Sequence, residues 1–357
     1  MIKIAGGGVS GLTAAINLAK RGYEVEVYEK QRHFNKYHIS AIRNYDLDVD
    51  ALDEFKKCGV SLKPSSFSNK VLKFSPNNFI EEKSKKPIFY IFERGSAKNS
   101  IENQLLEQAE NLGVKIFMGK YIEEEEADII ATGPIRNDIF AYGHIYDNVE
   151  IPENTSYIIY DNLYAPKGYI YILSAEGKTI IASVSFDKEK FKYVPINFSI
   201  FLRKYDFVNE MVKNKEPIFK ISGFGNYDMP KKAKKDGKFL IGERGFFMDA
   251  SKGFGIRYAI ITGYLVAEAI DKKIDYDKLW KNKLRKELLM NLKRRFVLNN
   301  ITNNDYDNML SKMGKSINIE KYIKETRKFK KHFDFLFPLY LWKYRIKNRL
   351  SLKNKIT

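Results

Sequence analysis

The N-terminal residues carry the pattern Gly6-x-Gly8-x-x-Gly11, which is typical of a turn that binds a diphosphate. Gly6 permits a sharp bend, Gly8 keeps side chains away from the pyrophosphate, and Gly11 lets a helix approach its strand closely. Amide groups at the start of that helix then face the anion. The sequence therefore predicts a nucleotide-binding turn that also contains Val9 and Ser10.

Glu29 provides the carboxylate that a nucleotide-binding turn of this kind needs at the end of its second strand. Glu29 ends a run with strand character, and Lys30 follows it. An acidic side chain about 20 residues after the glycines can accept hydrogen bonds from both hydroxyls of an adenosine ribose. This arrangement favours NAD or FAD over a cofactor with a 2′-phosphate.

These residues need a strand, a helix and a second strand to position them. The sequence predicts a strand at 2–5, a helix at 12–21 and a strand at 23–28. The order strand, turn, helix, strand and acid is typical of a βαβ nucleotide site. Because the unit begins at residue 2, we expect no secretory or transit peptide ahead of it.

A second glycine-rich segment lies far along the chain. The run 238–245 predicts a strand and a turn that contains Glu243. Gly253-x-Gly255-Ile256 then predicts the start of another helix. Glycines and a helix start can face a cofactor, and the carboxylate can bond a chain of hydroxyls. We therefore expect both glycine turns to converge on one extended ligand.

The rest of the chain mixes helical and β-rich patterns. Helices are expected at 49–57 and 100–112, and helical spacing of apolar residues returns at 276–331. Strands are expected at 71–75, 87–92, 114–117 and 127–134, with a polar hairpin region between the first two, and an antiparallel sheet is expected across 145–186.

These motifs resemble those of the FAD-dependent oxidoreductases with the p-hydroxybenzoate hydroxylase fold, and most closely those of the geranylgeranyl reductase branch. The similarity covers roughly residues 1–275 and implies FAD as the cofactor. Besides the first glycine turn, Glu29 and Lys30, the residues that we expect to bind FAD are Arg43, Arg94, Thr132, Gly133, Glu243, Gly253, Gly255 and Ile256.

The fold class that follows is α/β, with a Rossmann-like FAD-binding domain, an inserted antiparallel β-sheet substrate domain and a C-terminal helical segment. The expected boundaries are 1–65, 90–140 and 222–275 for the FAD-binding domain, 66–89 and 141–221 for the β-rich domain, and 276–357 for the basic helical segment.

The resemblance implies hydride transfer between flavin and an apolar or lipid substrate, as in the reduction of isoprenoid double bonds. Tyr169 and Tyr171 lie in a stretch similar to the substrate-cavity motif of the reductases, although their spacing equally suits an ordinary strand with one buried side. Glu243 replaces the family's aspartate, and Tyr171 replaces its tryptophan. An aromatic monooxygenase, a prenyl cyclase that does not consume reduced flavin, and a degenerate flavin- or lipid-binding protein stay open as alternatives. The sequence assigns no catalytic residue and no metal site.

The net charge of +18 is concentrated near the C-terminus, where residues 281–357 hold 21 Lys and Arg and six Asp and Glu. Aromatic and basic residues alternate at 333–349, which favours contact with an anionic membrane surface over the alternative, a pair of helices with a solvated basic face. No DNA- or RNA-binding pattern accompanies the charge, so no nucleic-acid partner is expected.

The cysteine count indicates the compartment of the protein, and the number of nucleotide-binding motifs indicates its electron donor. Cys58 is the one cysteine of the sequence, so an internal disulfide or a cysteine-based metal cluster is excluded. We expect a cytoplasmic protein, peripheral on the inner face of the membrane. Because the sequence holds no second complete glycine unit, we expect electrons from a ferredoxin or from transiently bound NAD(P)H.

Overall fold

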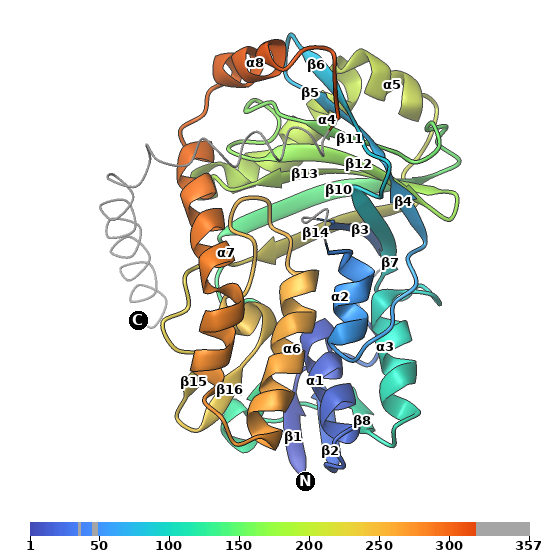
Figure 1. The fold of residues 1–357 in the computed structure, drawn as a ribbon. Helices are drawn as coiled ribbons and strands as arrows, with labels where there is room; N and C mark the ends of the chain where they lie inside the picture. The colour runs from blue at the N-terminus through green and yellow to red at the C-terminus, as the bar shows by residue number, and fades with distance from the viewer. Residues whose placement is uncertain (35–36, 45–48, 319–357) are drawn as a thin grey trace.

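The computed structural model describes residues 1–34, 37–44 and 49–318. Within these residues the strands form three sheets, of six, eight and three strands. Figure 1 shows the six-stranded sheet near the N-terminus and the eight-stranded sheet at the opposite end of the molecule. The expected α/β class, with an antiparallel sheet and C-terminal helices, is confirmed.

The six-stranded sheet has the order β15-β16-β9-β1-β2-β8 and is parallel except at the β15–β16 pair. Its strands are β1 (Ile2–Ala5), β2 (Val25–Glu29), β8 (Lys115–Met118), β9 (Ile129–Ile130), β15 (Lys234–Lys235) and β16 (Lys238–Leu240).

Helices pack on this sheet, and inward-facing residues of its central strands, such as Ile4 and Val27, are fully buried. Helix α1 (Val9–Ala19) packs against α6 (Ile256–Asp271) and α3 (Ile101–Glu110). Fully buried side chains of β1 and α1, such as Ile4 and Leu12, form the centre of this core. The same layer of helices includes α2 (Ala51–Lys57).

The eight-stranded sheet has the order β14-β10-β13-β12-β11-β5-β6-β17. Its pairs are antiparallel except β11–β5 and β17–β6. Its strands are β5 (Lys70–Phe74), β6 (Phe79–Lys83), β10 (Ile139–Asp147), β11 (Thr155–Ile159), β12 (Tyr169–Ala175), β13 (Lys178–Ser185), β14 (Phe219–Gly225) and β17 (Ser316–Asn318).

The third sheet is antiparallel and has the order β3-β7-β4, with β3 (His38–Arg43), β4 (Ser66–Ser68) and β7 (Phe89–Arg94). On one face of the large sheet, α4 (Val194–Lys204) buries Phe198 and Phe201, and α5 (Asp206–Val212) follows it. Short 3-10 turns complete the chain at η1 (Glu124–Glu126), η2 (Lys188–Tyr193) and η3 (Gly242–Gly245).

One long helix joins the two large parts of the molecule. Helix α7 (Tyr276–Leu298) runs along the side of the molecule in Figure 1 and is followed by α8 (Asn303–Lys312). Trp280 lies in the core beneath α6, whereas Leu292 packs in a second core beside the large sheet. Because one helix contributes to both cores, it fixes the nucleotide half against the β-rich half.

Several predicted elements need correction. Helix α1 begins at Val9 rather than at residue 12, because the amide of Leu12 already bonds the carbonyl of Gly8 at 2.9 Å. The strands predicted at 71–75 and 87–92 are not neighbours: an unpredicted strand, β6, pairs with β5, and β7 joins β3 and β4 in another sheet. The helical pattern after residue 276 is interrupted by strand β17. The three-unit division of the chain stays a prediction.

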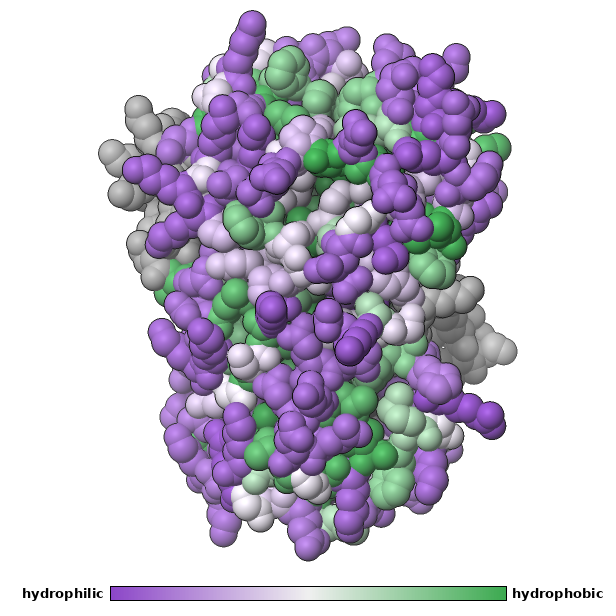
Figure 2. Space-filling model, turned by 90° about the vertical axis from the view of Figure 1, so that its right-hand side faces the viewer, coloured by the Kyte–Doolittle hydropathy of each residue, from purple (hydrophilic) through white to green (hydrophobic). Residues whose placement is uncertain are grey.

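Figure 2 shows the face seen from the right-hand side of Figure 1 as mainly hydrophilic, with apolar side chains in scattered groups. Among the described residues, no helix is both long enough and apolar enough to span a bilayer. The basic aromatic stretch at 333–349 lies outside the described residues, so the predicted membrane contact stays a prediction.

Candidate functional site

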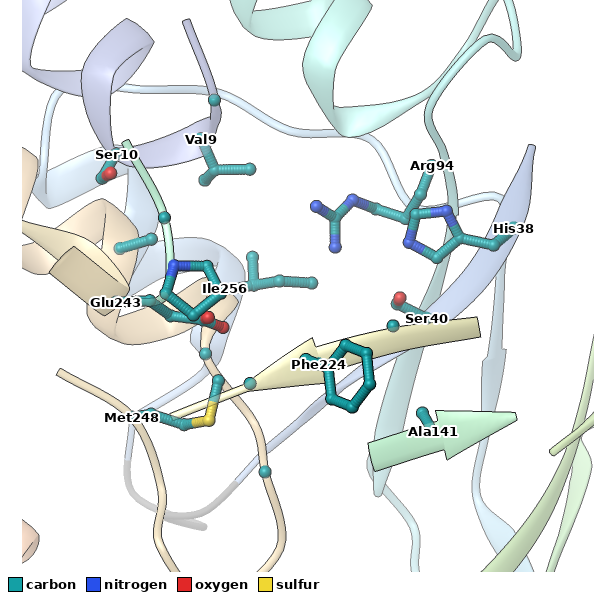
Figure 3. Close-up of a pocket in the computed structure, with 18 of the residues that line it drawn as sticks. Val9, Ser10, His38, Ser40, Arg94, Ala141, Phe224, Glu243, Met248 and Ile256 are labelled. Atoms are coloured by element: carbon teal, nitrogen blue, oxygen red, sulfur yellow. The ribbon is translucent and has the colours of Figure 1, made fainter. Parts of the chain in front are cut away.

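A cavity of about 1060 Å³ lies where the three sheets meet. Its walls come from the β1–α1 turn, the ends of β2 and β9, the start of α6, and inward-facing residues of β3, β10, β12 and β14. Figure 3 shows Ser10 and Glu243 on one side of the cavity, with Arg94 and His38 on the opposite side. The two glycine turns of the sequence therefore open into a single space.

The three glycines of the first turn have three different surroundings. Gly6 has a φ of +102°, and a Cβ there would lie 2.4 Å from the Ala131 carbonyl oxygen. A Cβ on Gly11 would lie 2.0 Å from the Gly6 carbonyl oxygen, so glycine there lets α1 lie close to its strand. A Cβ on Gly8 would meet nothing within 4 Å. Gly8 therefore keeps space open for a ligand rather than for protein.

Glu29 is held at the cavity by two backbone amides. Its Oε2 accepts from the Gly7 amide at 2.9 Å, and its Oε1 accepts from the Gln31 amide at 2.9 Å. A carboxylate has about four acceptor positions, so these bonds fix its orientation and leave positions for two ligand hydroxyls. Lys30 lines the same wall.

The start of α6 forms another part of the cavity wall. Gly255 is the N-cap residue of α6 and Ile256 its first residue, and both line the cavity. Gly253 has a φ of +78°, which favours glycine. In the described part of the chain, no side chain caps the first turn of α6 or of α1. Both helices therefore present free amides and a positive dipole end to an anionic or electron-rich ligand.

Arg94 carries the positive charge that reaches into the cavity (Figure 3). Its Nε donates to Glu102 at 2.8 Å, and Glu102 also accepts from the Gly95 amide at 3.1 Å. Burial raises the pKa of Glu102, but the Arg94 charge and these hydrogen bonds outweigh that effect and hold the pKa below its usual value. The ion pair fixes Arg94 while the cavity side of its guanidinium stays available.

Glu243 stands beside the start of α6. Its Oε1 lies 3.2 Å from the position that a Cβ on Gly255 would take. Desolvation raises the pKa of Glu243 to about 7, and the positive charge of Arg94 opposes that rise. A carboxyl with this pKa can be protonated at neutral pH, so it can donate a hydrogen bond as well as accept one.

The remaining predicted cofactor residues divide into two groups. Thr132 and Gly133 line the cavity, and the Thr132 hydroxyl donates to Glu124 at 3.1 Å. Arg43, expected to face the cofactor, instead lines a separate cavity of about 20 Å³. Strand β3 places His38, Ser40 and Ala41 at the large cavity and ends at Arg43, opposite Phe89.

The predicted substrate residues lie on one face of β12. Tyr169, Tyr171 and Leu173 line the cavity, whereas Ile170 and Ile172 are buried in the core beneath α4. This alternation follows from the two-residue period of a strand. Burial raises the pKa of Tyr171, so its hydroxyl is neutral at physiological pH.

Sequence reasoning missed several residues that line the cavity. Strand β3 contributes His38 and Ser40, although no strand was predicted there. Strands β10 and β14 contribute Ala141 and Phe224, which Figure 3 shows on neighbouring strands. Lys252, just before the second glycine turn, also lines the cavity. The position of Lys252 directly before the motif was a usable signal, whereas the other four residues depend on strand pairing.

The comparisons with known proteins agree with this geometry. The NAD(P)-binding Rossmann-like domain family matches residues 4–48. A digeranylgeranylglycerophospholipid reductase of Methanocaldococcus jannaschii is 25% identical over 193 residues, which cover 50% of this chain and 49% of the relative. The match thus spans about half of the curated relative's length.

Solved structures resemble the chain over most of its length. A geranylgeranyl bacteriochlorophyll reductase-like protein from Thermoplasma acidophilum has a TM-score of 0.71 at 18% identity, covering 87% of this chain and 90% of that one. The chain has the fold of the FAD-dependent oxidoreductases that include geranylgeranyl reductases. The flavin-dependent brominase Bmp2 shares it with a TM-score of 0.60 at 17% identity, covering 83% of this chain and 85% of that one.

The residues that line the cavity fit FAD, the cofactor that the family resemblance implies. Gly8 leaves room for a diphosphate, the amides of α1 face it, and Glu29 has free acceptor positions for a ribose. Arg94 would meet the phosphates or the ribityl chain, and the start of α6 would face the flavin ring. FAD supplies hydride chemistry when bound, while the chain supplies orientation and charge.

Proposed function

We propose that the chain is an FAD-dependent reductase of isoprenoid double bonds. The observation that carries this proposal is the continuity of the cavity from the nucleotide turn into an apolar chamber. The chamber is lined by Ile158, Leu173 and Ala141 together with the ring of Tyr171. The same cavity also presents His38, Ser40 and Lys252, so its wall combines apolar surface that suits a hydrocarbon chain with a few polar groups that could orient it.

The chain's own residues support hydride transfer in two ways. The free amides of α6, beginning at Gly255, would stabilise negative charge on a reduced flavin ring placed beside them. The aromatic and aliphatic residues of β12 would exclude water from the reacting double bond. The first effect would favour the charged, reduced form of the flavin, and the second would keep water away from the hydride transfer.

The comparisons support this reaction class and leave its substrate as our proposal. One relative is named a digeranylgeranylglycerophospholipid reductase, but the match covers half of each chain. The same fold occurs in 2-methyl-3-hydroxypyridine-5-carboxylic acid oxygenase, with a TM-score of 0.57 at 15% identity over 83% of this chain and 89% of that one. An oxygenase of aromatic substrates is therefore the competing outcome of the test.

We further propose that electrons come from a ferredoxin or from transiently bound NAD(P)H, and that the lipid substrate is met at an anionic membrane surface. The excess of positive charge suits an acidic protein carrier as well as anionic headgroups. Adding each candidate donor to the oxidised holoenzyme, and following flavin absorbance, separates the two donors.

A single-turnover experiment tests the proposed function. The holoenzyme is reduced chemically without oxygen and mixed with a lipid that carries geranylgeranyl chains. We expect flavin reoxidation and a mass gain of two hydrogens for each double bond reduced. Oxygen-dependent hydroxylation of an aromatic compound, without any lipid reduction, would show an oxygenase. Failure of the purified chain to take up FAD would overturn both assignments.

A further inference from the structure

Reduction of a double bond needs a proton as well as a hydride, and one lysine is placed to provide it. Lys252 lies in the loop between Asp249 and Gly253, directly before α6. It is half-buried and lines both the large cavity and the adjoining small one. Its side chain therefore lies between the chamber proposed for the substrate and a space large enough for about one water.

Two tyrosines hold the Lys252 side chain. Its Nζ donates to the Tyr160 hydroxyl at 3.0 Å and lies 4.6 Å from the centre of the Tyr160 ring. It also lies 5.5 Å from the centre of the Tyr169 ring, and the Tyr169 hydroxyl donates to the Lys252 carbonyl at 2.5 Å. The ammonium group is thus held by a phenol and two ring faces, while its other hydrogens stay available to a ligand.

The charges around Lys252 oppose its protonation. Burial is the largest influence, and the positive charges of Arg43 on β3 and Arg295 on α7 add to it. Asp249 on the same loop and Glu82 on β6 act in the other direction, but Asp249 already accepts from Ser251 at 2.6 Å and Glu82 is paired with Lys73. Together these effects lower the pKa of Lys252 to about 7.

We propose that Lys252 is the acid that protonates the substrate double bond. This role rests on the proposed reductase function. The π electrons of the double bond form a new C–H bond with the Nζ proton, and the other carbon accepts a hydride from reduced FAD, which becomes oxidised. Lys252 is left as a neutral amine and regains a proton from water. Tyr160 acts as a positioning residue, because its hydroxyl orients Nζ.

The test compares Lys252→Met, which keeps the length and apolar stem, with Lys252→Arg, which keeps a charge that does not titrate near neutral pH. Both are studied as holoenzymes in the single-turnover assay with a geranylgeranyl lipid. We expect Lys252→Met to bind FAD like the wild type and to lose at least about 100-fold in the rate of lipid reduction, within the range for a lost general acid. We expect the wild-type rate to fall as pH rises above about 7 and this dependence to be absent from both variants.

Two measurements distinguish a proton-donating role of Lys252 from a purely structural one. In heavy water both added hydrogens are deuterium, because the transferable N–H of reduced flavin and the Nζ proton both exchange with solvent. The wild type should give a single stereochemistry at the carbon that Lys252 protonates, and residual product from Lys252→Met should carry deuterium on both faces of that carbon. NMR of ¹³C-lysine in the apoprotein should show one resonance that titrates near pH 7 and is missing from Lys252→Met. Tyr160→Phe should change the rate less than Lys252→Met and should retain the stereochemistry.

The outcomes are distinguishable. Wild-type rate and stereochemistry in Lys252→Met would overturn the role of Lys252 while leaving the reductase intact. Absence of lipid reduction by the wild-type holoenzyme would overturn the proposed function and the role of Lys252 with it. If Lys252→Met fails to fold, Lys252→Arg provides the same comparison, because a wild-type pH profile in that variant would contradict the proposal.

Discussion

Gly8 and Gly255 line the same cavity although they come from opposite ends of the nucleotide-binding part of the chain. Each is the residue that precedes a helix, and the helices that follow them, α1 and α6, pack against each other. A Cβ on Gly263 of α6 would lie 2.7 Å from the carbonyl of Ser10, so glycine at this crossing lets the two helix starts approach. One extended ligand can therefore meet the amides of both.

The first prediction compares two glycines of one turn, Gly8, which faces the ligand space, and Gly11, which packs against protein. Gly8→Ala adds a methyl group where only ligand space exists, so FAD affinity should fall at least about tenfold with little change in apoprotein stability. Gly11→Ala should cost about 3 kcal/mol or more, because its Cβ would lie 2.0 Å from a carbonyl oxygen. Flavin fluorescence titration and urea unfolding measure the two effects. Equal stability losses would contradict this division of roles.

The second prediction concerns the ribose carboxylate. Glu29→Gln keeps the shape of the side chain but replaces a charged acceptor with a neutral amide. Because a hydrogen bond to a charged group contributes about 1.5–3 kcal/mol, we expect FAD affinity to fall about 10- to 100-fold. Calorimetric titration of FAD and of riboflavin provides the measurement and its control, since riboflavin lacks the adenosine ribose. A matching loss of riboflavin affinity would show that Glu29 acts elsewhere.

The third prediction concerns the ion pair at the cavity wall. Arg94→Met leaves the Glu102 carboxylate buried without its partner, which should cost about 3–5 kcal/mol of stability. The double variant Arg94→Met/Glu102→Gln should recover most of that stability. FAD affinity should stay low in both, because the guanidinium that faces the cavity is gone. Full recovery of FAD binding in the double variant would exclude Arg94 from contact with the cofactor.

The fourth prediction concerns pH and stability. The pKa of Glu243 is about 7 in the folded chain and about 4.5 when unfolded, so the folded state holds the proton more tightly. Stability of the apoprotein should therefore fall by roughly 1–3 kcal/mol as pH rises from about 4.5 to 7, and level off above that. Glu243→Gln should remove this part of the pH dependence. Identical urea midpoints against pH for both proteins would contradict the burial of this carboxyl.

The fifth prediction tests the apolar chamber without touching the nucleotide turn. Ala141→Phe adds a ring to the part of the cavity shown beside Phe224 in Figure 3. We expect FAD affinity to stay within about twofold, whereas reduction of geranylgeranyl lipids should fall at least about tenfold through lost binding. A lipid with shorter isoprenoid chains serves as the control and should be affected less. Equal effects on both lipids would show that the isoprenoid chain of the substrate lies elsewhere in the cavity.

The sequence alone was sufficient for the nucleotide half of the site. The βαβ unit was predicted from the spacing of Gly6, Gly8 and Gly11 and from the number of residues between them and Glu29. Each of these residues is required locally, either by the backbone turn or by the nucleotide. The FAD-type fold was expected from a family resemblance that included the second turn at Gly255. The beginning of α1 was misplaced by three residues, because the turn amides already take part in the helix.

Only the tertiary structure decided what surrounds a substrate. His38, Ala141 and Phe224 reach the cavity because β3, β10 and β14 meet there through pairings between distant segments, which no local pattern encodes. The same pairings turned Arg43 away from the large cavity. Lys252 was visible in the sequence as a basic residue beside the second glycine turn. The rings around it come from other parts of the chain: Tyr160 follows β11, and Tyr169 begins β12. Local spacing thus determined the glycine turn, whereas long-range packing determined which side chains surround the cavity beside it.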